Sequence, residues 1–79
     1  MTTRDILIEG IQHLINRMLG TKPKKSEIRV IDFSDWDEFP NPKKGTIPHK
    51  IVFKYCYMQF HYELDAKGEE FLWLDRIGG

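Results

Sequence analysis

The apolar residues near the start of the chain recur with the period of an α-helix. At about 100° per residue they fall within one arc of roughly 140° between residues 5 and 19. The members of this stripe are Leu7, Ile8, Ile11, Leu14, Ile15, Met18 and Leu19. Thr2 or Thr3 can cap the start, and Gly20 is placed to end the helix before Pro23. The pattern predicts an amphipathic helix over 5–19 with its apolar stripe in a core.

Three features of this helix bear on that prediction. Ile6 lies outside the stripe and is expected to be exposed. Gly10 weakens the helix by about 1 kcal/mol relative to alanine, which indicates a close approach of another backbone segment. A helix on a membrane surface, the main alternative, carries lysine on its polar face. The polar face here carries Glu9, Arg17 and neutral residues, so the pattern favours a core helix.

The second half of the chain is rich in Val, Ile, Phe and Tyr, which is typical of β-strands. Residues 27–34 predict a first strand, whose apolar residues on both faces indicate flanking structure or a bulge. Residues 47–64 predict one long strand with a bend or bulge near 53–55, since most strands have about 5–6 residues. Residues 65–68, Asp-Ala-Lys-Gly, predict a type I turn with a left-handed glycine, which leads into a third strand over 69–77.

The turn at 65–68 fixes the register of this hairpin and therefore its two faces. It places His61 opposite Trp73, and Met58 opposite Arg76. The predicted core face consists of Val52, Cys56, Met58, Phe60, Tyr62, Leu64, Leu72 and Leu74. The predicted second face consists of Phe53, Tyr55, Tyr57, His61, Phe71 and Trp73, mixed with Gln59, Glu63 and Asp75. A slip of one residue would exchange Phe71 and Trp73 with their leucine neighbours.

Together these elements predict an α+β fold in which an N-terminal amphipathic helix packs on a three-stranded antiparallel sheet, in the order α-β-β-β. The chain has 79 residues, which is enough for one domain with a small core. We therefore expect residues 1–79 to form a single small α+β domain. One helix covers only one face of a sheet, so the second, aromatic face is expected to meet a partner or to be partly exposed.

Composition makes several functional classes unfavourable. The formal net charge is zero, so no overall field steers the protein to nucleic acid or to an anionic membrane. The one cysteine excludes an internal disulfide, and the chain lacks the features of a signal peptide. Both observations favour a reducing compartment, the cytoplasm. No apolar run reaches the roughly 20 residues that span a bilayer, so no membrane is expected as a partner.

Two loops carry unusual sequences. Residues 21–26 form a basic linker, which is either solvated or a contact to phosphate. Residues 35–42, Asp-Trp-Asp-Glu-Phe-Pro-Asn-Pro, join three acids to Trp36 and Phe39, and their prolines forbid regular structure. The two aromatic side chains either cover the edge of a small core or form a protruding loop. A protruding loop of this kind would recognise a basic partner.

Residues with chemical potential do not combine into a reactive site. Cys56 and His61 are five positions apart, so they face opposite sides of a regular strand. His49 and His61 lie roughly 40 Å apart if the strand is extended. We expect Cys56 to be a buried structural residue. The acidic residues that might hold a hard cation lack the spacing of a Ca²⁺ loop; they are Asp32, Asp35, Asp37 and Glu38. With no nucleotide, zinc or protease motif present, we expect no cofactor, no metal and no enzyme.

The aromatic second face and the loop around Trp36 favour a non-catalytic protein-binding module, such as an adaptor, an inhibitor or an immunity-type factor. The expected partner-binding residues are Trp36, Phe39, Tyr55, Tyr57, His61, Phe71 and Trp73. The partner is another protein, or a second copy in a face-to-face homodimer. The alternative is a nucleic-acid-binding domain that stacks bases on the sheet aromatics. Its phosphate contacts would be Lys22, Lys24, Lys25, Lys43, Lys44 and Lys50.

Two partial resemblances add little to this reading. The chain ends Ile77-Gly78-Gly79, and a terminal Gly-Gly is similar to the tail of ubiquitin-like modifiers and sulfur carriers. Those families begin with a β-hairpin, whereas this chain begins with a helix. The order of one helix and three strands resembles the first part of a double-stranded RNA-binding domain. The lysine-rich second helix of that family has no counterpart, so no binding residues are carried over.

Overall fold

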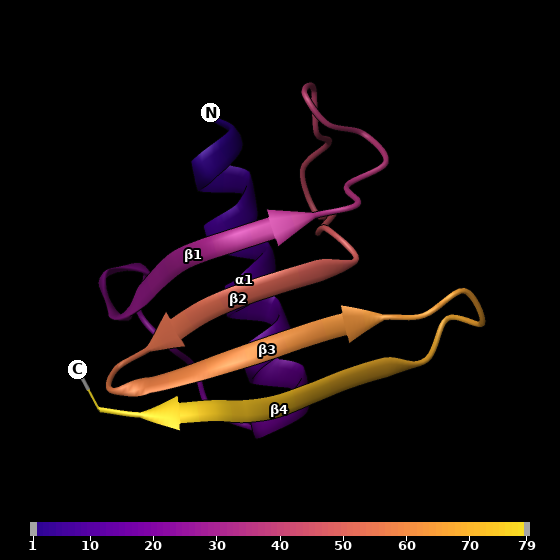
Figure 1. The fold of residues 1–79 in the computed structure, drawn as a ribbon. Helices are drawn as coiled ribbons and strands as arrows, with labels where there is room; N and C mark the ends of the chain where they lie inside the picture. Colours follow the sequence, from indigo (N-terminus) through magenta and orange to yellow (C-terminus); the bar gives the residue numbers. More distant parts are fainter. Residues whose placement is uncertain (1, 79) are drawn as a thin grey trace.

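A computed structural model describes residues 2–78 as one α-helix followed by a four-stranded antiparallel sheet (Figure 1). The elements in chain order are α1 (Thr3–Leu19), the short 3-10 helix η1 (Lys25–Glu27), β1 (Ile28–Ser34), β2 (Lys50–Tyr55), β3 (Met58–Leu64) and β4 (Glu70–Ile77). The strands lie in the sheet in the order β1-β2-β3-β4, and α1 crosses behind them. The α+β class and the N-terminal helix are confirmed. The prediction of three strands is wrong, because the described residues form four.

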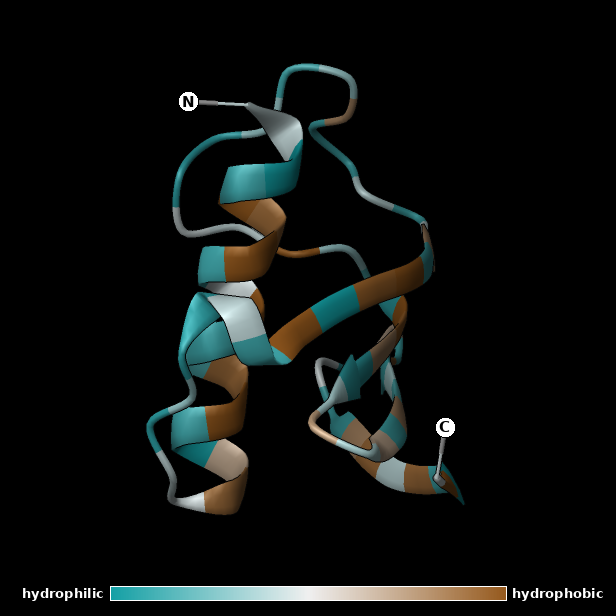
Figure 2. Cartoon of the chain, turned by 90° about the vertical axis from the view of Figure 1, so that its left-hand side faces the viewer, coloured by the Kyte–Doolittle hydropathy of each residue, from teal (hydrophilic) through white to brown (hydrophobic). Residues whose placement is uncertain are grey.

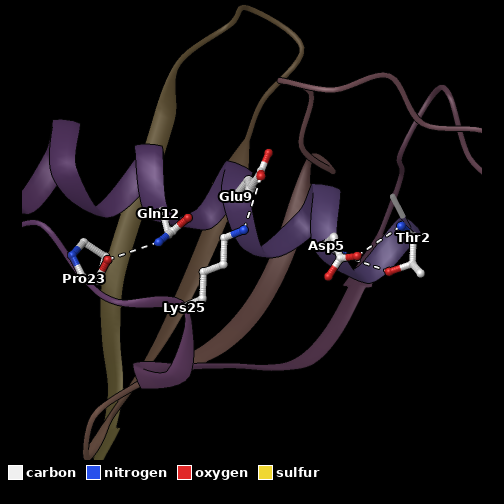
Figure 3. Close-up of polar contacts among 6 residues, drawn as sticks. All are labelled: Thr2, Asp5, Glu9, Gln12, Pro23 and Lys25. Atoms are coloured by element: carbon white, nitrogen blue, oxygen red, sulfur yellow. Dashed lines mark hydrogen bonds and ion pairs between the residues drawn. The ribbon is translucent and has the colours of Figure 1, made fainter.

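The ends of α1 are set by local sequence signals. Thr2 Oγ1 accepts a hydrogen bond from the Asp5 backbone N–H at 3.2 Å, and Asp5 Oδ2 accepts one from the Thr2 N–H at 3.1 Å (Figure 3). This reciprocal capping box satisfies two donors that a helix start leaves free. At the other end Gly20 has a left-handed φ of 73°, and its N–H donates to the carbonyl oxygen of Asn16. Both ends of the predicted helix are therefore confirmed to within two residues.

The long loop between β1 and β2, residues 35–49, covers a second side of α1. A Cβ added at Gly10 would lie 2.2 Å from Ile47 Cγ2 and 3.3 Å from the carbonyl oxygen of Thr46. The close approach expected at Gly10 is therefore confirmed. Ile6 lies one turn earlier on the same side of the helix. Its predicted exposure is wrong, since the side chain belongs to the buried core.

The linker from α1 to β1 runs back along the polar side of the helix. Gln12 Nε2 donates to the carbonyl oxygen of Pro23 at 3.2 Å, and Lys25 Nζ lies 3.3 Å from Glu9 Oε1 (Figure 3). Pro23 is itself buried. The basic linker at residues 21–26 is thus held against the helix. It lies on the side of the molecule away from the sheet face that α1 leaves uncovered (Figure 2).

A two-residue turn at Cys56 and Tyr57 divides the predicted long strand into β2 and β3. Tyr55 pairs directly with Met58, and Cys56 has a left-handed φ of 56°. The Cys56 N–H donates to the carbonyl oxygen of Glu27 at 3.0 Å, which holds the turn against the end of η1. Glycine or asparagine normally marks turns of this kind. The absence of either residue explains why the pattern predicted only a bend.

The turn reverses the phase of β2 relative to the prediction. Ile51 and Phe53 face α1 and are fully buried, and Phe53 stacks on Phe60 with ring centroids 5.6 Å apart. The assignment of Val52 and Cys56 to the core is therefore wrong. Cys56 is exposed, and Val52 lies on the opposite face of the sheet.

The hairpin of β3 and β4 follows the predicted register over most of its length. His61 pairs with Trp73, Gly68 has a φ of 83°, and Asp65 Oδ1 accepts hydrogen bonds from two backbone N–H groups of the turn. A bulge next to Gln59 then shifts the far end, so that Met58 pairs with Ile77. The predicted pairing of Met58 with Arg76 is wrong for this reason.

A bulge in β1 resolves its two-sided apolar pattern. The bulge lies between Val30 and Asp32, so that Val30 pairs with Phe53 while Phe33 pairs with Ile51. Both partners are core residues, and Val30 and Phe33 therefore share the face toward α1. The bulge was one of the two structures expected here.

An ion pair connects the last turn of α1 to the start of β4. Both guanidinium nitrogens of Arg17 donate to the carboxylate of Glu70, and Tyr62 Oη donates to Glu70 Oε2 at 2.7 Å. The Arg17 hydrogen bonds, followed by that of Tyr62, lower the pKa of the Glu70 carboxyl group, although partial burial opposes them. Burial and the neighbouring carboxylate raise the pKa of Tyr62.

This network predicts a loss of stability in acid. A carboxyl group whose pKa is lower in the folded protein than in the unfolded chain adds stability above its unfolded pKa. That stability is lost as the pH falls through the lower, folded pKa. We expect the free energy of unfolding at neutral pH to fall by about 1 kcal/mol in Glu70→Gln, a value kept small because Arg17 is half exposed. The difference from the parent protein is expected to shrink as the pH falls below 4.5, the ordinary pKa of a glutamate, and to disappear below the lower pKa that Glu70 has in the folded protein.

Urea unfolding at several pH values measures this effect. Glu69→Gln is the matched control, because the described structure gives the Glu69 side chain no hydrogen bond or ion pair. A Glu70→Gln variant with the same pH profile as Glu69→Gln would show that the pair adds nothing to stability.

Candidate functional site

The face of the sheet opposite α1 is covered by no described helix or strand, and Figure 1 looks directly onto it. Cross-strand pairing arranges its side chains in three rows, which together we call the open face. The central row is Asp32, Val52, His61 and Trp73. One flanking row is Ser34, Lys50, Glu63 and Phe71, and the other is Arg29, Lys54, Gln59 and Arg76. None of these side chains is buried.

The central row holds a stacked pair of rings. The imidazole of His61 and the indole of Trp73 are nearly parallel, at an interplanar angle of 10° with centroids 4.4 Å apart. Such stacking favours one orientation of the indole. Trp73 is nevertheless 42% exposed. A large, pre-oriented and accessible aromatic ring is the kind of side chain that dominates protein interfaces.

The acidic flank of the open face joins Phe71 to a small charge network. Phe71 is 45% exposed beside Glu63. Lys50 Nζ lies 3.8 Å from Glu63 Oε1 and 3.9 Å from Asp35 Oδ2, so that its charge is shared between the sheet and the following loop. These exposed pairs add little stability. They do keep the surroundings of Phe71 polar and close to neutral.

The other flank is basic. Arg29, Lys54 and Arg76 occupy one row across three strands, with Gln59 between Lys54 and Arg76. Gln59 Nε2 donates to Asp75 Oδ2 at 3.0 Å, which holds that carboxylate at the edge of the row. The three cations have no ion-pair partner in the described part of the chain. They form a local positive strip on a protein whose net charge is zero.

The loop at 35–49 places its two aromatic residues differently. Trp36 is only 8% exposed, donates from Nε1 to Thr46 Oγ1 at 3.2 Å, and packs edge-on against Phe33 at 5.7 Å. Phe39 lies on its outer side and is 53% exposed. Trp36 therefore closes the edge of the core, and the reading of this loop as one that presents its tryptophan to a partner is corrected.

The two tyrosines predicted to join the aromatic face do not lie on it. Tyr55 points toward the helix side, packs against the core, and its Oη lies 3.4 Å from Thr21 Oγ1. Tyr57 is highly exposed at the tip of the turn between β2 and β3. The structure thus brings together His61, Phe71 and Trp73 of the seven residues predicted to bind a partner. It separates from them Trp36, Phe39, Tyr55 and Tyr57.

Several open-face residues escaped the sequence analysis. Arg29, Lys54 and Arg76 lie far apart in the chain, and no local pattern connects them. Their alignment depends on the turn at Cys56 and on the bulges in β1 and β4. A glycine at position 56 would have been the signal for that turn. Without it, the sequence pattern did not show that these three cations lie on one face of the sheet.

The reactive side chains remain separate in the fold. The Cys56 thiol donates to Glu27 Oε2 at 3.4 Å, and partial desolvation together with this carboxylate raises the pKa of the thiol. A raised pKa disfavours the thiolate that nucleophilic chemistry needs. The His61 imidazole stacks on the Trp73 indole on the open face. Across residues 2–78, no three His, Cys, Asp or Glu side chains gather as a metal site would require.

The fold defines an α+β domain with a single helix on one face of a four-stranded antiparallel sheet. No protein-family model, curated protein sequence or solved structure matches this chain. In the described residues, no helix has the length and apolar character needed to cross a membrane. The resemblance to a Gly-Gly tail depends on Gly79, which lies outside the described residues.

Proposed function

We propose that this chain is a non-catalytic protein-binding module that docks a partner on the open face around Trp73. The observation that carries the proposal is the distribution of exposed apolar side chains. Eight large hydrophobic residues are exposed in the described chain, and half of them belong to β4. Phe71 and Trp73 of these four lie on the open face, and Leu74 and Ile77 lie on the helix side of the same edge strand. Apolar exposure gathered on one strand marks an interaction site better than the same residues scattered singly.

The charges around Trp73 suggest the chemistry of the partner. The basic row runs beside the central row, with Arg76 on the same strand as the stacked indole and Lys54 two strands away. A partner with an apolar side chain for Trp73 and acidic residues toward this row is complementary in both respects. This revises the basic partner that the acidic loop at 35–42 suggested, because Trp36 lies in the core. The exposed free thiol of Cys56 fits a reducing compartment such as the cytoplasm.

A comparison of two aromatic variants tests the proposal. We expect Trp73→Ala to weaken binding of the partner by about 2 kcal/mol, or roughly 30-fold, because it removes the central anchor of the surface. Tyr57→Ala is the matched control, since Tyr57 is exposed but lies off the open face. The partner is first captured on immobilised protein from nuclease-treated lysate, identified by mass spectrometry, and then titrated by calorimetry. Equal affinity of Trp73→Ala and the parent protein would place the binding site elsewhere.

Nucleic acid binding is a second candidate, favoured specifically by the basic row beside the Trp73 indole. A base could stack on the ring while Arg29, Lys54 and Arg76 contact phosphates. Two of the lysines expected earlier are already paired, Lys25 with Glu9 on the helix side and Lys50 with Glu63 and Asp35 on the acidic flank. Fluorescence anisotropy with a single-stranded oligonucleotide at several salt concentrations separates the candidates, since phosphate binding weakens steeply with salt.

A further inference from the structure

Strand β4 forms one edge of the sheet and lacks the usual protection of an edge strand. None of its eight residues is buried, and its central residues Phe71-Leu72-Trp73-Leu74 include no proline and no charge. Both of its faces are apolar, since Trp73 lies on the open face and Leu74 on the helix side. An exposed apolar edge with free backbone groups is a template for another strand.

The opposite edge of the sheet is protected. Strand β1 carries the bulge between Val30 and Asp32, and the Phe33 N–H already donates to Asp32 Oδ1 at 2.9 Å. A bulge in the middle of an edge strand, together with an occupied donor, discourages a further strand. The bulge in β4 lies nearer its end, at Asp75, and leaves residues 70–74 in regular pairing. One free and one protected edge favour pairing of like with like, which closes as a two-fold dimer, over head-to-tail growth.

We propose that β4 pairs in antiparallel orientation with β4 of a second copy, with Trp73 at the two-fold axis. Across residues 72–74 this register keeps each face continuous, because residues opposite one another in antiparallel strands point to the same side. On the helix side, Leu72 of each copy meets Leu74 of the other. The charges also match along the strand, because Glu69 before its start is acidic and Arg76 near its end is basic. Glu70 does not contribute, since it is already bound by Arg17 and Tyr62.

The dimer doubles the proposed docking surface. Two four-stranded sheets become one eight-stranded sheet, and the Trp73 side chains of both copies meet at the centre of its open face. The open face of each copy then receives an aromatic residue from the other. The pairing itself follows from the edge strand, whereas the use of the doubled face rests on the function proposed above.

Edge variants of the whole chain test the dimer. We expect sedimentation equilibrium of the parent protein to show a monomer–dimer equilibrium with a dissociation constant of about micromolar, as befits a small interface. Leu74→Lys is expected to weaken it at least about tenfold, because lysine on an edge strand opposes pairing. Ile31→Lys, on the other edge and similarly exposed, is the matched control and is expected to dimerise like the parent. Circular dichroism checks that both variants fold.

A charge exchange and amide hydrogen exchange locate the interface. Arg76→Glu is expected to weaken the dimer, because it sets like charges against each other across the interface. Adding Glu69→Arg is expected to restore the dimer. A variant that had simply failed to fold would not be rescued in this way. Amides of β4 are expected to gain protection as the protein concentration rises. A monomer up to about millimolar concentration, an open-ended polymer, or a dimer whose β4 amides gain no protection would each overturn the inference. Loss of partner binding in Trp73→Ala, measured separately, would still support the proposed function in that case.

Discussion

Replacement of Trp36 by alanine is expected to lower the free energy of unfolding by about 3–4 kcal/mol. The indole is buried, closes the edge of the core between Phe33 and Phe39, and donates a hydrogen bond to Thr46. Alanine removes this packing and leaves a cavity that the loop at 35–49 has to collapse into. In a domain of this size, such a loss corresponds to a fall in melting temperature of about 15 °C or more.

Thermal and urea unfolding measure the effect of Trp36→Ala against two matched variants. Phe39→Ala changes the exposed outer member of the same aromatic cluster, and we expect a cost below about 1 kcal/mol. Trp73→Ala removes the same side chain from an exposed position and is also expected to leave the fold stable. If Trp36→Ala unfolds at the same urea concentration as Phe39→Ala, Trp36 does not close the core.

The comparison also matters for the proposed function. Lost binding in Trp36→Ala has no simple interpretation, because the variant is expected to lose stability throughout the core. Trp73→Ala is the informative variant, since the indole lies on a rigid strand and its main described contact is the His61 ring. The choice between these two tryptophans follows from their burial, which is the reverse of what their neighbours in the sequence suggest. Trp36 lies between two aspartates and is buried, whereas Trp73 lies between two leucines and is exposed.

Replacement of Gly10 by alanine is expected to lower the free energy of unfolding by about 2 kcal/mol, although alanine is the better helix former. Helix propensity alone would raise stability by about 1 kcal/mol. The added methyl group, however, would lie 2.2 Å from Ile47 Cγ2, and the Thr46 carbonyl oxygen limits the space behind it. Overpacking of this kind costs about 1–3 kcal/mol or more, and here it also pushes the loop at 35–49 away from α1.

A double-mutant cycle separates the steric clash from other effects. Ile47→Ala removes the methyl group that the new Cβ would meet, so Gly10→Ala is expected to be much less damaging in that background. His13→Ala, at an exposed position of the same helix, is the control and is expected to be neutral or slightly stabilising. Additive effects of Gly10→Ala and Ile47→Ala would show that the two residues do not contact each other in solution.

The features determined by the sequence itself are those with short-range physical causes. The period of α1, its capping box at Thr2 and its left-handed Gly20 depend on residues within two turns of one another. The turn at 65–68 likewise depends on Asp65 and Gly68 alone, and it fixes the pairing of His61 with Trp73. Hydrogen bonds and steric limits of this range are readable from a pattern, because every partner lies in the same segment.

Only the tertiary structure decided the features that depend on distant partners. The turn at Cys56 carries no turn residue; it forms where β2 and β3 bury Phe53 against Phe60, and Glu27 holds its backbone. That turn sets which residues of β2 reach the core and which reach the open face. The burial of Trp36 similarly depends on the path of the whole loop at 35–49. Alternation shows that a strand has two faces, but only the packing of the helix decides which face is buried.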